Sequence, residues 1–244
     1  IITMPVSFLS LNIEADRHLD KVVSYLAANM PDVVFLQEVY KIHAEEIAAQ
    51  FEYQLSFAPH VDFNISEHIF KPLGEWGIAT LTKVKPVNVQ LDYYSEHPVV
   101  IPHEFMKTLK HPRALLVSEI VIEGKSYFFA NTHFTWALTT DADVAQYPDY
   151  LRLQKLLDKM PSFVLAGDLN TNRGSRVYQE LASPSIDQPP GDPTPTLDPI
   201  LFRKPELELV VDHLFSTPEY HMENVQVISG LSDHCGISCQ ITRV

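Results

Sequence analysis

The sequence predicts an α/β protein in which two β-sheets pack face to face and helices cover their outer faces. The first observation is the order of the early elements, where apolar runs typical of buried strands alternate with apolar residues at helical spacing. The second is a weak internal similarity between two segments. Helical spacing, a proline, an apolar run and a carboxylate follow one another over 19–38 and again over 151–168. Two β–α–β halves of this kind favour two packed sheets.

The first half of the chain predicts strands and helices in alternation. The apolar spacing over 16–30 is that of a helix with Asp16 as its N-cap. The segment 58–76 is polar and irregular, and the segment 97–112, rich in proline and histidine, is expected to be a loop or a lid. The alternating strand 87–93 is expected to pair with the strand before it. The elements expected here are strands 6–12, 32–39, 77–83 and 87–93 and helices 16–30 and 41–51.

The second half predicts a hairpin, two further helices and the remaining strands. Glu123 and Gly124 separate two apolar runs, which is the sequence signature of a β-hairpin. The segment 183–205 is rich in proline and poor in apolar residues, so we expect a long surface loop. The elements expected here are strands 113–122, 125–131, 163–172, 207–215, 225–228 and 235–241 and helices 148–160 and 175–181.

Length, composition and charge indicate one globular domain. With 244 residues, 45% of them hydrophobic, the chain can bury a sizeable core, and we expect a single domain over 1–244. The net charge of −13 argues against a protein that follows long duplex nucleic acid, and it is compatible with a small phosphorylated substrate. Its apolar runs are too short to span a bilayer, and the first residues lack signal-peptide features. We therefore expect a soluble protein, cytoplasmic unless a targeting segment precedes residue 1.

The two cysteines are not expected to bond to each other. Cys235 and Cys239 belong to one expected strand, in which about 13 Å would separate them at ~3.3 Å per residue. A disulfide requires Cα atoms within about 7 Å of each other. The cysteines also lack neighbouring ligands at the spacing of a zinc site.

Several expected strands end in polar side chains that can bind a metal ion or transfer a proton. Asp168 and Asn170 are two positions apart on one apolar strand, so we expect them to project together from its end. Any one such residue has an ordinary structural interpretation, as a turn residue or a buried histidine with a partner. Together they supply oxygen ligands for Mg²⁺ or Mn²⁺ and imidazoles beside them. The other polar positions are Asn12, Glu38, His133, Asp212, Asp233 and His234.

Six short motifs occur in order, each in or at the end of an apolar run. They are Leu11-Asn12, Leu36-Gln37-Glu38, Thr132-His133, Gly167-Asp168-Leu169-Asn170, Val211-Asp212-His213-Leu214-Phe215 and Ser232-Asp233-His234. This ordered set resembles the endonuclease/exonuclease/phosphatase superfamily, the group of deoxyribonuclease I, and the resemblance covers 6–241. Each motif alone is weakly specific, whereas six in the same order are a strong signal. The resemblance implies a four-layer α/β/β/α sandwich with mixed sheets and a site at one end of them.

The resemblance also implies a phosphoester hydrolase that depends on Mg²⁺ or Mn²⁺, most of all a phosphodiesterase that uses in-line attack of water. Glu38 would be the principal metal ligand, with Asn12 beside it and Asp233 near the ion. Glu14 occupies a position where some members carry a second acidic group. Arg113 lies where several members place an arginine near the phosphate.

The catalytic roles follow from the same resemblance. Asp168 would activate or orient the attacking water, and Asn170 would hold a phosphoryl oxygen or the nucleophile. His133 would contact a non-bridging phosphate oxygen. His234, positioned by Asp212, would stabilise the transition state or take a proton, because family members differ over which residue is the base.

Two other functional classes share some of these features. A non-catalytic binding module on the same fold stays open, although such modules lose site residues that this chain keeps. A binuclear metallophosphatase of the calcineurin type requires a Gly-Asn-His motif, which the sequence lacks. The substrate stays open among nucleic acid, nucleotides and phospholipid head groups, and the sequence implies no stable protein partner.

Overall fold

The computed structural model describes residues 4–63, 73–95, 101–102, 112–136, 143–183, 194–204 and 206–244. In chain order, the elements are β1 (Val6–Asn12), α1 (Leu19–Asn29), β2 (Val33–Tyr40), α2 (Lys41–Phe51), β3 (Gln54–Asp62), β4 (Glu75–Thr82), β5 (Asn88–Tyr93), β6 (Ile101–Pro102), β7 (Ala114–Ile122), β8 (Lys125–Thr132), α3 (Asp143–Leu157), β9 (Val164–Asp168), α4 (Arg176–Leu181), β10 (Asp212–Ser216), β11 (Tyr220–Ile228) and β12 (Gly236–Arg243). Among the described residues, no helix is long and apolar enough to cross a membrane.

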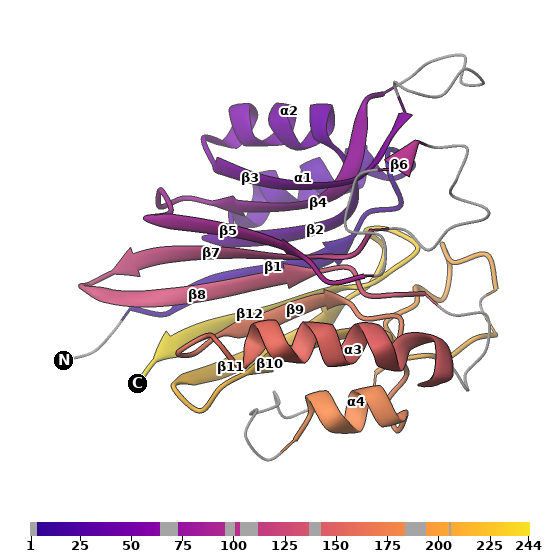
Figure 1. The fold of residues 1–244 in the computed structure, drawn as a ribbon. Coiled ribbons are helices and arrows are strands. Elements are labelled where there is room, and N and C mark those ends of the chain that lie inside the picture. The colour runs from indigo at the N-terminus through magenta and orange to yellow at the C-terminus, as the bar shows by residue number, and fades with distance from the viewer. Residues whose placement is uncertain are drawn as a thin grey trace.

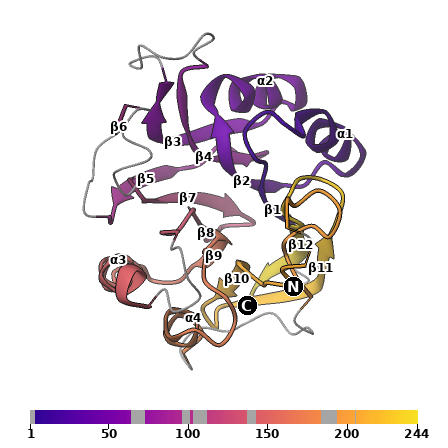
Figure 2. The same ribbon diagram turned by 90° about the vertical axis from the view of Figure 1, so that its right-hand side faces the viewer.

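Two mixed β-sheets form the centre of the molecule. The strand order is β11-β12-β1-β2-β4-β3-β6 in the first sheet and β10-β9-β8-β7-β5 in the second. The sheets stack on each other, with α1 and α2 on the outer face of the first and α3 and α4 on the outer face of the second (Figures 1 and 2). The expected four-layer α/β/β/α sandwich is therefore confirmed.

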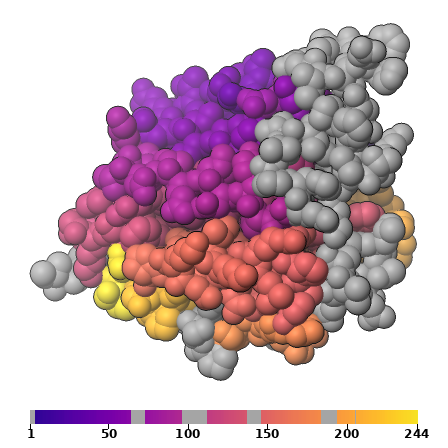
Figure 3. Space-filling view, in the orientation of Figure 1, coloured from indigo at the N-terminus to yellow at the C-terminus, as the bar shows by residue number. Residues whose placement is uncertain are grey.

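Side-chain alternation along the strands separates the apolar layers. Phe8 of β1 points between the sheets, where its ring stacks on that of Phe129 of β8 at a centroid distance of 6.1 Å. Leu9, the next residue, belongs to the outer core that Val22 and Leu26 of α1 complete. Helices α3 and α4 cover the second sheet in the same way, and Figure 3 shows them across the lower part of the face in view. Successive residues of a strand therefore point alternately to the core between the sheets and to the core under the helices.

Strand direction brings the polar strand ends to one end of the sandwich. Strands β1 and β2 are parallel, as are β8 and β9, so the residues that follow the two strands of each pair lie at the same end. Strands β12 and β10 run antiparallel to β1 and β9, so their first residues lie at that end too. In this register Asp212 pairs directly with Asp168.

Two helices begin elsewhere than predicted. Helix α1 begins at Leu19, and His18 precedes it without a side-chain capping hydrogen bond, so Asp16 is not the N-cap. Asp16 lies one turn earlier, and its carbonyl accepts a long hydrogen bond of 3.5 Å from the Leu19 amide. Helix α3 begins at Asp143, before the predicted start, and Pro148 lies inside it. A proline marks a probable helix boundary only, because a helix can continue through it when neighbouring contacts compensate.

Three strand predictions are corrected. Strand β3 (Gln54–Asp62) occupies the beginning of the segment that we expected to be irregular. Strand β5 pairs with β7 in the second sheet rather than with β4, and its alternating Val89 and Leu91 are exposed. Alternation identifies a strand, but it specifies neither the partner nor which face is covered. Strand β10 begins at Asp212, so 207–211 lie outside it.

The proline-rich segment 183–205 is a surface loop only in part. Thr196, Leu197 and Asp198 are buried, and Leu197 forms an isolated β-bridge with His234. Polar residues in an apolar-poor stretch are buried here because tertiary hydrogen bonds satisfy them. Much of the expected loops lies outside the described residues, namely 64–72, 96–100, 103–111 and 184–193.

Several local predictions are confirmed. Helix α2 spans Lys41–Phe51, as expected. Glu123 and Gly124 join β7 to β8 with φ values of 51° and 77°, the positive values that a tight hairpin turn requires. Cys235 and Cys239 are both buried and unbonded.

Candidate active site

A bulge in β2 directs the Glu38 side chain to the end of the sandwich. The pairing of β2 with β4 shifts register between Leu36 and Val39. Glu38 has a φ of 56°, an unfavourable backbone conformation for a residue with a Cβ atom. Bulges and positive φ values of this kind concentrate at functional sites, where they re-aim a side chain. The bulge therefore places a carboxylate beside the end of β1.

Asn12, the last residue of β1, links carboxylates from the two sheets. Its buried Nδ2 donates to Glu38 Oε1 at 3.2 Å and to Asp168 Oδ2 at 3.0 Å. Its Oδ1 accepts from the Glu14 amide at 3.1 Å, which fixes the orientation of the carboxamide. Glu38 and Asp168 thus approach each other across the sheet interface through one shared donor.

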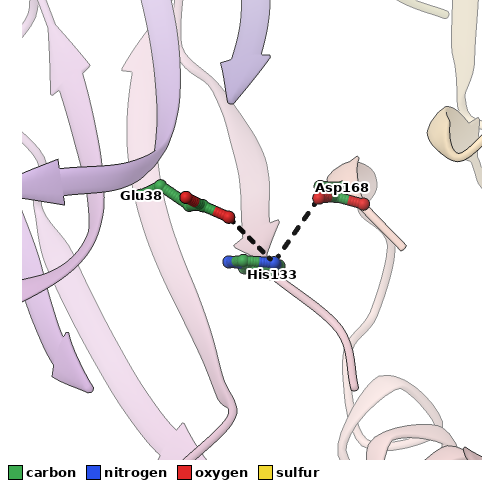
Figure 4. A group of neighbouring side chains, drawn as sticks. All are labelled: Glu38, His133 and Asp168. Atoms are coloured by element: carbon green, nitrogen blue, oxygen red, sulfur yellow. Dashed lines mark ion pairs between the residues drawn. The ribbon is translucent and has the colours of Figure 1, made fainter. Parts of the chain in front are cut away.

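His133 lies between these two carboxylates (Figure 4). Its Nε2 is 3.4 Å from Asp168 Oδ2 and 3.9 Å from Glu38 Oε1. The ring packs against the rings of Trp76 and His60, with centroid distances of 6.3 and 6.4 Å. The histidine is therefore held by buried aromatic neighbours.

Arg113 is hydrogen-bonded to the backbone of His133. Its buried guanidinium donates from Nη1 to the His133 carbonyl at 3.2 Å. Burial lowers the pKa of this guanidinium, although nearby groups, among them Tyr94 and Asp168, act against the shift. Arg113 thus lies close to the site and holds the backbone of His133.

Asp168 and Asn170 are brought together, but not as neighbours on one strand face. Strand β9 ends at Asp168, whose Oδ1 accepts from the Asn170 amide at 2.9 Å. Asn170 has a φ of 48°, and its Nδ2 donates to the Phe134 carbonyl at 3.1 Å. Gly167, just before Asp168, lets β9 approach the end of β8 closely, because a Cβ atom there would lie 1.8 Å from the Thr132 carbonyl oxygen.

His234 and Asp212 form a hydrogen-bonded pair next to Asp168. His234 Nδ1 lies 2.8 Å from Asp212 Oδ2, and His234 Nε2 lies 3.9 Å from Asp168 Oδ2. All three side chains are buried. The carboxylate of Asp212 thereby orients the imidazole toward the other carboxylates.

The charges of the site perturb one another. Burial raises the pKa of the Glu38 carboxyl and raises that of Asp168 to about 7. Burial also raises the pKa of Asp233. For His234, burial opposes the charged form, but the carboxylates of Asp212 and Asp168 outweigh it and raise the pKa well above its ordinary value. The cluster thus holds more carboxylates than it can easily ionise without a cation.

The donor set fits a divalent metal ion. One ligand atom from each of Glu38, His133 and Asp168 lies within 4.8 Å of the others, and the same holds for Asp168, Asp212 and His234. Carboxylate oxygens are the ligands that Mg²⁺ and Mn²⁺ take, and an ion would reverse the pKa increases that burial causes. The clusters found among the described residues do not include Glu14 or Asp233.

Glu14 and Asp233 take other positions. The Glu14 carboxylate forms ion pairs with Arg17 at 3.0 Å and Arg203 at 2.9 Å and lies 3.4 Å from His18 Nε2. Asp233 is buried, and its Oδ1 accepts from the Ser232 hydroxyl at 3.2 Å. Both residues are therefore near the site, with protein partners of their own.

Sequence reasoning missed Thr196, which secures the His234–Asp212 pair. Its buried Oγ1 accepts from the Val211 and Asp212 amides at 2.9 and 3.0 Å. Its carbonyl accepts from the Cys235 amide at 2.7 Å, next to His234. A threonine in a proline-rich stretch carries no local signal for this role, because its partners are distant in the sequence.

The model of the endonuclease/exonuclease/phosphatase family matches residues 9–234. A comparison with curated proteins found no match. The human nocturnin catalytic domain with bound sulfate anion is similar in structure, with a TM-score of 0.73, 18% identity and coverage of 99% of this chain and 94% of that chain.

Two further solved structures cover nearly all of both chains. TDP2 of D. rerio complexed with a single-strand DNA product has a TM-score of 0.69 and 18% identity, and the match covers 98% of this chain and 99% of that chain. The mannosyl-6-phosphatase Bt3783 of Bacteroides thetaiotaomicron VPI-5482 has a TM-score of 0.71 and 16% identity, with coverage of 97% and 99%. At these identities the likeness is one of fold alone.

Proposed function

Since the chain belongs to the endonuclease/exonuclease/phosphatase family, we propose that it is a hydrolase of phosphoester bonds that requires Mg²⁺ or Mn²⁺. We further propose a phosphodiester as the substrate. The observation that carries the proposal is the convergence of Glu38, His133 and Asp168 from both sheets, with the His234–Asp212 pair beside them.

The metal would be held by Glu38, with Asn12 and Asp233 near it and with Asp168 on the other side of the shared Asn12 amide. A bound ion supplies Lewis-acid stabilisation of charge on the phosphoryl oxygens. The raised pKa of the half-buried Glu38 supports this assignment, because a cation in the cluster would offset the cost of removing these charges from water. Glu14 is the weaker candidate, since Arg17 and Arg203 already pair with its carboxylate.

The remaining polar side chains would act on water and phosphate. Asp168 orients the attacking water and accepts its proton, and the Asn170 carboxamide holds the nucleophile or a phosphoryl oxygen. His133 donates a hydrogen bond to a non-bridging oxygen. His234, kept in place by Asp212, donates to the charge that develops on the phosphoryl group. Arg113 adds positive charge near the phosphate.

The substrate class is set by chemistry outside this cluster. The solved relatives include a complex with a single-strand DNA product and a mannosyl-6-phosphatase, so diesters and monoesters both belong in a screen. The net charge of −13 favours a nucleotide, a nucleic-acid end or a lipid head group over long duplex DNA. A panel of oligonucleotides, nucleotides, phospholipids and sugar phosphates with Mg²⁺ or Mn²⁺ addresses this choice.

The test is loss of hydrolysis in folded variants. Glu38→Ala and Asp168→Asn should each abolish hydrolysis of bis(p-nitrophenyl) phosphate, and excess chelator should do the same to the wild type. Asp158→Asn makes the same charge change at an exposed position after α3 and is the matched control. Full activity in either site variant or in chelator would reject the metal-dependent hydrolase. Failure of the wild type on the whole panel would favour a non-catalytic binding module.

A further inference from the structure

A glutamine of α3 joins the two loops that carry the site. Gln146 is fully buried, and its Nε2 donates to the Thr135 carbonyl at 2.6 Å and to the Asn170 carbonyl at 2.8 Å. One carboxamide nitrogen therefore uses both of its protons on two different segments. Thr135 follows His133 on the loop after β8, and Asn170 follows Asp168 on the loop after β9.

The orientation of this carboxamide is determined by its partners. Both contacts are made to carbonyl oxygens, which accept only, so the nitrogen must face them. Gln146 Oε1 is buried and has no hydrogen-bond partner among the residues that the structure describes. The side chain is thus specialised for holding two carbonyls.

Asp149, one turn further along α3, adds a second link to the same loop. Its Oδ2 accepts from the Thr135 hydroxyl at 2.6 Å, and its Oδ1 accepts from Arg152 at 2.7 Å. Residues three apart on a helix lie on the same face, so Gln146 and Asp149 both face the loop after β8. That loop is therefore attached to α3 at two consecutive turns.

The two loops are also bonded to each other. The Phe134 amide donates to the Asp168 carbonyl at 2.8 Å, and Asn170 Nδ2 donates to the Phe134 carbonyl at 3.1 Å. Gln146 adds to these bonds its two hydrogen bonds from α3, one to each loop. A displacement of its side chain would remove one shared support from both loops at once, and these loops carry His133 and Asp168.

We propose that Gln146 is a positioning residue for the reaction, which sets the relative placement of His133, Asp168 and Asn170 without touching the substrate. The inference rests on the proposed phosphoester hydrolysis. Small displacements of catalytic groups lower rates strongly, because the transition state requires defined geometry. Gln146 should therefore affect kcat more than KM.

The kinetic test compares the same substitution at two positions of α3. Gln146→Met removes both donated hydrogen bonds while keeping the side-chain length, and Gln154→Met changes an exposed residue of the same helix. With bis(p-nitrophenyl) phosphate and Mg²⁺, Gln146→Met should lower kcat about 10- to 100-fold, as losses of supporting partners do, with little change in KM. Gln154→Met should match the wild type. Equal kcat values in the two variants would overturn the proposal.

A double-mutant cycle shows whether Gln146 acts through Asn170. If it does, Asn170→Ala and Gln146→Met together should lower kcat by clearly less than the product of the separate losses. A residue that merely stabilises the fold would give independent effects, measured far below the unfolding temperature. Multiplicative losses would therefore contradict the positioning role.

Hydrogen exchange tests, without any substrate, whether Gln146 holds the two loops. The amides of Phe134 and Asn170 should exchange faster in Gln146→Met than in Gln154→Met, because their loops lose a shared anchor. Amide exchange shows whether Gln146 holds the two loops even if the wild type hydrolyses nothing on the panel. A failure of this positioning role can therefore be told apart from a failure of the proposed function. Unchanged exchange at both amides would overturn the proposal.

Discussion

Replacing Glu38 by glutamine should separate the stability of the metal-free protein from its response to metal. The Glu38 carboxyl lies 3.9 Å from His133 Nε2 and shares the Asn12 amide with Asp168, and burial raises its pKa. An acid with a raised pKa binds more protons when folded, so stability falls as the pH rises through the shifted range. Glutamine is neutral and can still accept from Asn12. The metal-free variant should therefore unfold at the wild-type temperature or above it.

The metal response of Glu38→Gln should change in the opposite direction. An ion at one hundred times its Kd stabilises a protein by about 2.7 kcal/mol. Loss of a ligand that lowers affinity about 100-fold leaves about 0.4 kcal/mol of that stabilisation. For a chain of 244 residues, each kcal/mol corresponds to about 2–4 °C in the unfolding temperature. The increase caused by metal should thus shrink by about 5–9 °C.

Scanning calorimetry near neutral pH measures both effects. Each protein is unfolded in chelator and then in saturating Mg²⁺ or Mn²⁺. Glu46→Gln makes the same change at an exposed position of α2 and should keep the full metal response. A metal-induced increase in Glu38→Gln equal to that of the wild type would refute Glu38 as a ligand.

Two further outcomes follow from the second sheet. His213 Nε2 donates a hydrogen bond to the Thr171 carbonyl oxygen at 2.7 Å, and burial lowers the pKa of this imidazole to about 4. Its contribution to stability is therefore complete above about pH 6.5 and is lost as the pH falls. Urea unfolding should show about 2 kcal/mol less stability at pH 5 than at pH 8 from this residue, a loss absent in His213→Phe. Parallel pH curves for the two proteins would contradict this expectation. Asp212→Asn should lower kcat about 10- to 100-fold by removing the charge that holds His234, while an unchanged kcat would show that the pair is not used.

The candidate site could be predicted to a large extent from local patterns. Apolar runs that end in Glu38, Asp168 and Asn12 identify strands and their polar ends, because burial and turn chemistry act over a few residues. The order of the motifs then indicates the family. The approach of Glu38 and Asp168 to one shared amide follows from the packing of the two sheets against each other, which no local pattern specifies.

The residues that support the site could not be predicted in the same way. Pro148 predicts a helix start, whereas α3 begins at Asp143, and Gln146 lies in the turn before the proline. Thr196 lies in a segment expected to be a surface loop, and its partners Val211 and Asp212 are fifteen or more positions away. Such residues act through hydrogen bonds to backbone groups, and these bonds leave no period in the sequence.

The sequence by itself determined most of the strands, the presence of the four helices and the set of polar side chains at the strand ends, because hydrophobic periodicity is a property of neighbouring residues. Only the tertiary structure decided which of these side chains meet. The β2 bulge turns Glu38 toward His133, and the antiparallel register of β9 and β10 places Asp212 beside Asp168. Pairing between distant strands depends on the whole packed sandwich, and this dependence is the physical reason why the site emerges only in three dimensions.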